Sequence, residues 1–156
     1  MDESPAREAA HILADSHLTS GHVRILKHGD TFAVFDEYGD MLSSRNGESG
    51  LYHDGTRFLS RFRFHLAGAR PFLLSSTVRD DNDQLVVALA NPDLCRDGYV
   101  YMPLGSLYLE WRKLLWRGVL YQELRIDNHG METADLEIAV HFAERQDNIE
   151  DGTSVP

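Results

Sequence analysis

The chain has 156 residues, of which 15 are basic and 25 acidic, and a formal net charge of −10. This length is typical of one domain with a single hydrophobic core. The negative charge repels phosphate backbones and anionic membrane surfaces, so we expect neither nucleic acid nor a membrane as partner. The amino terminus is acidic where a signal peptide would be basic, and the single cysteine, Cys95, fits a reducing compartment. The composition therefore predicts a soluble, cytoplasmic protein.

Residues 1–20 differ in kind from the rest of the chain. Pro5 to Leu18 is rich in alanine and straight-chain residues and follows Ser4, a favourable N-cap. This pattern predicts a short helix with a narrow apolar stripe, and a frayed tail is the alternative. From His22 onward the apolar residues repeat every second position, as in β-strands. We therefore divide the chain into a helix or tail (1–20), a β-domain (21–143) and an acidic carboxy-terminal tail (144–156).

The first half of the β-domain predicts strands separated by short turns. Gly29-Asp30 suits a two-residue type II′ turn. Alternate residues from Phe58 to Leu66 form one apolar face, and we expect this strand to pair with Arg70–Val78 across Gly68-Ala69. The run Gln84–Ala90 shows no alternation, which is typical of a strand covered on both faces.

The second half of the β-domain holds three longer segments, Ser106–Trp116, Val119–Asn128 and Thr133–Ala143. Turns at Arg117-Gly118 and near His129-Gly130 separate them, so they predict a three-stranded antiparallel meander. In the third segment apolar residues from Ala134 to Phe142 alternate with polar ones, and we expect the apolar face to lie in the core. In total, some nine strands predict an all-β fold, a large antiparallel two-sheet β-sandwich with a short N-terminal helix.

The segment Gly50–Phe62 gathers His, Asp, Thr and Arg side chains around Gly55. Such side chains can fix a bend through hydrogen bonds to the backbone. We expect Asp54 and Thr56 to hold the bend and Arg57 to tie it to a neighbouring carboxylate or carbonyl. A ligand-binding loop is the alternative.

The chain shows no pattern that specifies catalysis, a metal or a cofactor. Its eight histidines lack zinc-ligand spacing, and only the adjacent His53 and Asp54 merit inspection. The acidic run Asp80–Asp83 lacks EF-hand spacing and suits a solvated turn. A glycosidase would need two carboxylates placed across a sugar, and no such pair can be identified from spacing. We therefore predict no catalytic residue, no metal ligand and no cofactor.

Aromatic side chains on two neighbouring strands offer a carbohydrate-binding alternative. Trp111 alternates in step with Leu107, Leu109 and Leu115, so it lies on the same face of the strand and is expected to point inward. Tyr108 and Trp116 share the opposite parity and could stack on glucose rings, together with Tyr121 on the next strand. Core packing explains these aromatics about as well. The candidate glycan-binding residues are Asp54, Arg57, Arg61, Tyr108 and Trp116, with Arg63 as a further outward cation.

Five segments in this order resemble the N-terminal domain of bacterial and archaeal glycogen-debranching, amylo-α-1,6-glucosidase-like proteins. They are Phe32–Met41, Gly50–Phe62, Gly68–Ser76, Leu107–Gly130 and Asp135–Phe142. Asp54, Thr56 and Arg57 look like the Asp-Thr-Arg signature of that family, interrupted here by Gly55. Asn128-His129-Gly130 is similar to its Asn-aromatic-Gly turn, with histidine in the aromatic place.

The resemblance implies a large antiparallel β-sandwich and places the glycoside hydrolase chemistry in a following (α/α)6 barrel. Such a barrel needs many more residues than this chain has, so we expect no catalytic glutamates and no enzyme activity here. The expected function is that of a non-catalytic accessory domain of carbohydrate metabolism, which packs on a catalytic barrel or self-associates as a homo-oligomer. The alternative is an α-glucan-binding module.

Overall fold

The structure is a computed structural model that describes residues 22–42 and 49–144. The predicted helix at residues 5–18 and nearly all of the predicted acidic tail lie outside the described residues. Within the described ranges the fold is all-β and its strand pairs are antiparallel, as predicted. These ranges contain no helix that is long and apolar enough to cross a membrane.

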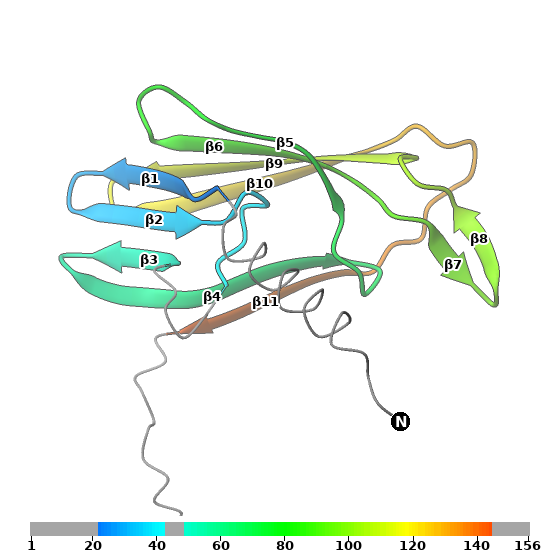
Figure 1. The fold of residues 1–156 in the computed structure, drawn as a ribbon, viewed down its shortest axis with the longest axis horizontal. Helices are drawn as coiled ribbons and strands as arrows, with labels where there is room; N and C mark the ends of the chain where they lie inside the picture. Colours follow the sequence, from blue (N-terminus) through cyan, green and yellow to red (C-terminus); the bar gives the residue numbers. More distant parts are fainter. Residues whose placement is uncertain (1–21, 43–48, 145–156) are drawn as a thin grey trace, which may run out of the picture.

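The strands form two layers and one separate hairpin (Figure 1). Sheet A has the order β1-β2-β3-β4-β11, with β1 (Arg24–His28), β2 (Thr31–Phe35), β3 (Gly50–His53), β4 (Thr56–Leu66) and β11 (Ile138–Glu144). Sheet B has the order β10-β9-β6-β5, with β5 (Phe72–Val78), β6 (Gln84–Ala90), β9 (Leu107–Trp116) and β10 (Val119–Asn128). The hairpin consists of β7 (Leu94–Arg96) and β8 (Tyr99–Met102).

Tight turns follow directly from the glycine positions. Between β1 and β2 only Gly29 has a positive φ, of 60°, which fits the predicted type II′ turn. Between β9 and β10 both Arg117 and Gly118 have positive φ, 48° and 77°, as a type I′ turn requires. The twist of such turns matches that of the strands they join, so two residues suffice.

The pairing predicted between residues 58–66 and 70–78 is wrong. After β4 the chain turns at Ala67-Gly68 and crosses to the other sheet, where β5 pairs with β6. An isolated bridge from Leu66 to Ala69 closes the turn itself. Alternation determines which face of a strand is buried but not which strand lies beside it.

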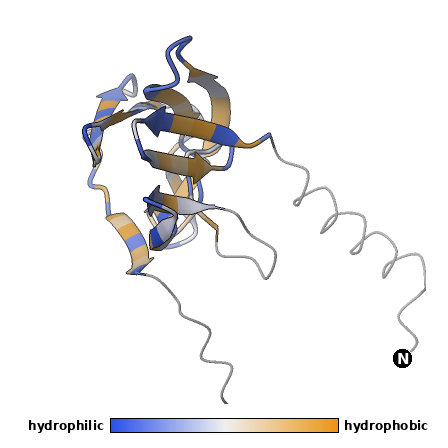
Figure 2. Cartoon of the chain, turned by 90° about the vertical axis from the view of Figure 1, so that its left-hand side faces the viewer, coloured by the Kyte–Doolittle hydropathy of each residue, from blue (hydrophilic) through white to orange (hydrophobic). Residues whose placement is uncertain are grey.

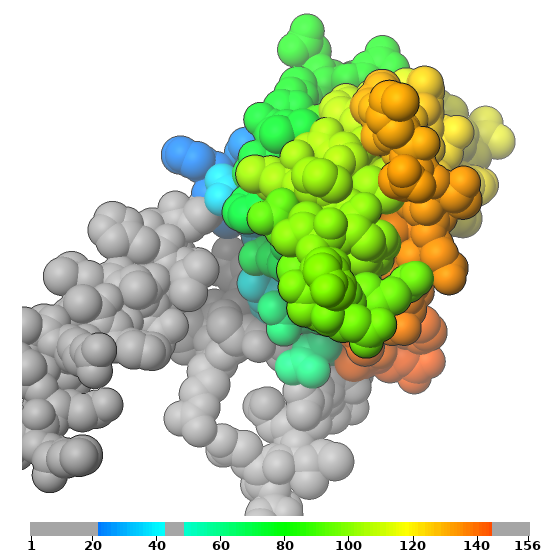
Figure 3. Space-filling model, turned by 90° about the vertical axis from the view of Figure 1, so that its right-hand side faces the viewer, coloured from blue at the N-terminus to red at the C-terminus, as the bar shows by residue number. Residues whose placement is uncertain are grey.

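The predicted three-stranded meander is also wrong in its third strand. β9 and β10 form the expected hairpin, but residues 129–137 cross between the sheets and β11 pairs with β4. Figures 1 and 3 show this crossing segment, in orange, beside the β7-β8 hairpin at one end of the sandwich. The connection is long enough for a change of sheet, and the sequence pattern alone could not distinguish it from a long turn.

The inward side chains of both sheets form one core. Trp111 points inward as predicted, is 4% exposed and contacts the rings of Phe64 and Phe62 edge-on, at centroid distances of 4.6 and 5.5 Å. Most of β6 is buried on both faces, which confirms the interpretation of Gln84–Ala90. The apolar face of β4 is buried from Ser60 to Leu66.

Candidate functional site

The segment singled out from the sequence is a β-hairpin, formed by β3 and β4. Its two-residue turn is Asp54-Gly55, with φ values of 47° and 75°, which fits a type I′ turn. The Asp54 carboxylate is exposed and lies 3.3 Å from Nε2 of His53, whose Nδ1 is 2.8 Å from the Thr31 hydroxyl. The bend is therefore held by backbone conformation, and the described contacts of the Asp54 side chain do not include a hydrogen bond to that backbone.

Arg57 ties the hairpin to the neighbouring chain. Its guanidinium donates to the carbonyl oxygens of Ser49, at 2.6 Å, and Ser60, at 3.2 Å. This agrees with the expected tie to a carbonyl. Gly50 makes room for it, because a Cβ there would lie 2.8 Å from Arg57 Nε and 2.6 Å from the Leu59 carbonyl oxygen. Arg57 is half-buried and committed to these contacts, which leaves little of it for a ligand.

Arg61 lies elsewhere, on the outer face of sheet A. It is exposed and sits beside Ala143 of β11 in the sheet register. Arg63 follows on the same face beside His141. The structure therefore separates Arg61 from the other two candidates. Arg57 lies at the start of the same long strand, and Asp54 lies in the turn that precedes it.

The aromatic candidates share one face without forming one platform. Tyr108 and Trp116 both point to the outer face of sheet B, but they stand eight residues apart on β9, roughly 27 Å at the usual rise per residue. Between them Glu110 and Arg112 form an ion pair at 2.7 Å. Trp116 packs on the ring of His28 at 4.4 Å. Tyr108 and Trp116 therefore cannot bind the same short glycan segment.

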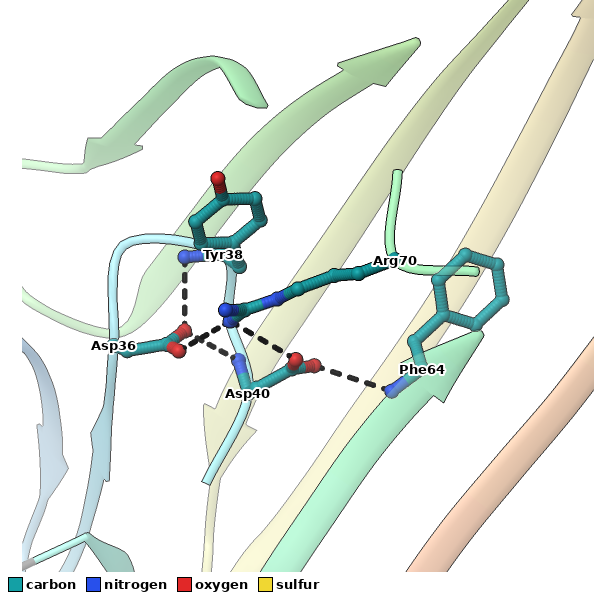
Figure 4. A network of polar contacts seen from close by, with 5 residues as sticks. All are labelled: Asp36, Tyr38, Asp40, Phe64 and Arg70. Carbon is teal, nitrogen blue, oxygen red and sulfur yellow. Dashed lines mark hydrogen bonds and ion pairs between the residues drawn. The ribbon is translucent and has the colours of Figure 1, made fainter. Parts of the chain in front are cut away.

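A polar network joins the loop that follows β2 to the crossover between the sheets (Figure 4). The sequence did not predict this network. Arg70 donates to the carboxylates of Asp36, at 2.5 Å, and Asp40, at 3.2 Å. The Arg70 guanidinium also lies 3.7 Å from the ring centroid of Tyr38. Asp40 accepts from the Phe64 backbone N–H at 3.2 Å. These contacts tie the loop after β2 to β4 and to the crossover that leads into β5.

Asp40 is the most perturbed acid of this network. It is 3% exposed, and burial raises the pKa of its carboxyl to about 6, with the nearby charge of Asp36 acting in the same direction. Arg70 opposes this shift. A buried carboxyl that already has a cation and a backbone donor is suited to structure rather than to contact with a substrate.

Lys113 is a second buried group that sequence reasoning missed. Its side chain has no exposed surface, and its Nζ donates to Gln122 Oε1 at 2.5 Å. Three aromatic rings surround the ammonium, those of Trp111, Phe62 and Phe35, at centroid distances of 4.1, 4.4 and 5.2 Å. The signal was present, because Lys113 shares the inward parity of Trp111 on the same strand.

Among residues 22–42 and 49–144, one long side of the sandwich is left without contacts between its two edge strands. At the opposite side β1 approaches β5, where Arg24 donates to the Ser76 hydroxyl at 3.0 Å. The open side lies between the edge strands β10 and β11. On β11, three apolar residues that share the face of the core remain exposed: Ile138 (46%), Val140 (44%) and Phe142 (71%). Figure 2 shows the apolar positions of β11, in orange, at the strand that precedes the grey tail.

The prediction that this apolar face of residues 134–142 lies in the core is therefore wrong for β11. The register places Val140 beside Phe64 and Phe142 beside Phe62, whose side chains are buried. Sheet B therefore covers the inward side chains of β4 but leaves those of β11 exposed. Leu124 on β10 is likewise inward and only half-buried. We call the inward apolar residues of these two strands the β10-β11 face; they are Leu120, Leu124, Ile126, Ile138, Val140 and Phe142.

No group of three or more His, Cys, Asp or Glu residues in the described ranges is placed to hold a metal ion. The pair of interest, His53 and Asp54, is exposed and has no third ligand near it in this part of the chain. The polar clusters described above make their contacts within the fold, whereas the β10-β11 face is an apolar surface that the described residues leave partly uncovered.

A family model described as the N-terminal domain of some glycogen debranching enzymes matches residues 26–144. The match begins within β1 and ends with β11, so it includes both sheets and the β10-β11 face. Comparison with curated proteins and with solved structures gave no match.

Proposed function

Because the chain belongs to the family of N-terminal domains of glycogen debranching enzymes, as its motifs predicted, we propose that it is a non-catalytic accessory domain that docks on protein through the β10-β11 face. The observation that carries this proposal is the exposure of Ile138, Val140 and Phe142 on the side of the sheet that faces the core. Contiguous exposed apolar side chains of this kind are typical of protein–protein contacts.

The arrangement of the carboxylates supports a non-catalytic role. Glycoside hydrolysis needs two carboxyl groups on either side of a sugar in an accessible cleft. Asp36 and Asp40 lie close together, but both bind Arg70, and Asp40 is buried. Purified protein is expected to release no glucose from a branched limit dextrin. Glucose release that co-purifies with the chain and disappears in Asp36→Asn would contradict the proposal.

Within a debranching enzyme, the partner that the family resemblance implies is the helical catalytic barrel. A suitable probe is the catalytic domain of an enzyme of this family, expressed without its own N-terminal domain. We expect the chain to be retained on the immobilised catalytic domain, and Phe142→Asp to abolish retention because it places a charge on the apolar face. The matched control is Met131→Asp, since Met131 is fully exposed but lies outside the β10-β11 face. Equal retention of both variants would argue against this face.

A second candidate function, α-glucan binding, is favoured by one observation. Trp116 and Tyr121 are both about half exposed on the outer face of sheet B, on neighbouring strands of the β9-β10 hairpin. Calorimetry with maltoheptaose at millimolar concentration tests this candidate. Binding heat that is lost in Trp116→Ala but kept in Tyr108→Ala would support it, and absence of heat would exclude it.

A further inference from the structure

We infer that β11 of one copy pairs antiparallel with β11 of a second copy about a twofold axis, so that two A sheets join and their open sides face each other. The inference rests on the proposed function in one respect: it takes the β10-β11 face as a docking surface. It adds the occupant of that face when the chain stands alone, namely the same face of another copy.

The composition of β11 differs from that of the other edge strands. Exposed edges of natural sheets are protected by charges, proline or bulges. β1 carries Arg24 and Lys27, and β5 carries a bulge near Leu73. β10 carries three charged residues on its outer face. In β11, by contrast, residues 138–143 contain no charged residue and no proline. The bulge of β11 lies at its very end, so its free edge is regular where it could pair.

The sequence of β11 allows it to pair with β11 of a second copy so that apolar residues face apolar residues. In antiparallel pairing centred on Val140, this residue faces Val140 of the other copy, and Ile138 faces Phe142. The inward face then continues across the axis with apolar pairs only. Centring the pairing on His141, a shift of two residues, would place Ile138 opposite Glu144, which is unfavourable. Centring it on Ala139 would place Phe142 opposite residue 136, which lies before β11 begins. The register centred on Val140 is therefore preferred.

The outer face adds charge complementarity. Arg61 lies beside Ala143 on the neighbouring strand. In the preferred register Ala143 faces Glu137 of the other copy. Arg61 and this glutamate are then separated by two strand spacings, roughly 10 Å between backbones, which long side chains can bridge. Both residues are exposed in the single chain. The same contact is made twice because of the twofold axis.

The size of the contact predicts a reversible dimer. One pair of short strands with three apolar side chains from each copy buries less than the roughly 1,600 Å² of a standard interface. We therefore expect a dissociation constant in the micromolar range. The net charge of −10 on each copy opposes association, so added salt should strengthen the dimer.

The test is sedimentation equilibrium of the purified chain at concentrations from about 1 to 300 μM, which bracket the expected constant. We expect a monomer–dimer equilibrium that Val140→Lys abolishes, because the axis would bring two lysines together. Val119→Lys is the matched control, since Val119 is similarly exposed, at 47%, but lies on the outer face of sheet B. It should leave the equilibrium unchanged.

Disulfide formation tests the register. In a Cys95→Ser background, Val140→Cys should form a disulfide-linked dimer under mild oxidation, whereas Val119→Cys should not. A strict monomer at all concentrations, or a dimer that persists in Val140→Lys, would overturn the inference. If the chain is monomeric but is still retained by the catalytic domain, only the self-pairing fails. If both are absent, the β10-β11 face is not a docking surface at all.

Discussion

Lys113 lies wholly inside the sandwich, with its Nζ 4.1 Å from the ring centroid of Trp111. The aromatic rings and Gln122 stabilise the ammonium, but they do not replace the hydration that burial removes. Burial consequently lowers the pKa of Lys113 from its usual 10.5 to about 7, against the opposing influence of Asp40 and Asp36. The core thus contains a charge whose presence depends on pH.

Replacing Lys113 with methionine should stabilise the protein at pH 6 and have less effect at pH 9. Between pH 7 and 10.5 the unfolded chain binds more protons at this residue than the folded chain, so the stability of the wild type rises with pH. A well-packed apolar replacement of a buried charge is often stabilising by about 1 to 4 kcal/mol. Urea unfolding at several pH values measures the difference.

The control for this variant is Lys27→Met, because Lys27 is exposed on β1. Its effect on the free energy of unfolding should be small and independent of pH over this window. If the difference between the wild type and Lys113→Met stays constant from pH 6 to 9, the ammonium is not the source of the effect.

Asp40 should make the free energy of unfolding fall as the pH rises, the opposite of the effect of Lys113, and should do so in the acid range. Its pKa is raised from 3.8 to about 6 in the folded protein, so the folded state retains a proton that the unfolded state has lost between these values. The stabilisation is complete below pH 3.8 and is lost as the pH rises through 6. Relative to Asp40→Asn, the wild type should therefore lose about 2 kcal/mol between pH 4 and 6, out of about 3 kcal/mol over the whole titration. Denaturation curves of both proteins at matched pH values measure this loss. If the free energies of unfolding of the two proteins change in parallel with pH, the Asp40 carboxyl titrates at its usual pKa and the prediction fails.

The close approach of neighbouring atoms to Gly50 predicts a large loss of stability when a methyl group is added at this residue. Gly50→Ala would bring Cβ to 2.6 Å from the Leu59 carbonyl oxygen, a backbone atom that cannot move away cheaply. We expect a loss of about 3 kcal/mol, because this clash adds to the strain that a φ of 154° imposes on any residue with a Cβ. Gly55→Ala is the matched control in the same hairpin, since its φ is 75° but nothing lies within 4 Å of the added carbon. It should cost only the left-handed strain, about 1 kcal/mol. Equal losses in thermal unfolding would contradict the steric argument.

The sequence predicted those features that depend on one strand or one turn at a time. The inward position of Trp111, the outward positions of Tyr108 and Trp116, and the Arg117-Gly118 turn follow from alternation and from glycine. The Asp54-Gly55 hairpin was also accessible, because Asp-Gly between alternating residues is a strong hairpin signal. The predicted bend fixed by the Asp54 and Thr56 side chains is in the structure this two-residue turn.

Features that depend on which strands meet were not accessible. β11 could have continued the β9-β10 hairpin as well as crossing to β4, since its alternation satisfies both arrangements. The exposure of its apolar face follows from the width of the opposite sheet, which no local pattern encodes. Likewise, Arg70 meets Asp36 and Asp40 only because the crossover brings them together.

The Asp54 turn provides a final prediction that separates a structural from a ligand-binding role. Asn is the favoured first residue of a type I′ turn, so Asp54→Asn should leave the melting temperature unchanged or slightly raised. Asp54→Val places a β-branched residue at a φ of 47° and should cost about 1 to 2 kcal/mol. The equivalent change Asp97→Asn, in the similar Asp97-Gly98 turn, controls for loss of charge. Thermal unfolding and calorimetry with maltoheptaose are measured on all three variants. A variant Asp54→Asn that keeps its melting temperature but loses glucan binding would show that the carboxylate contacts the ligand, because the backbone of the turn is preserved.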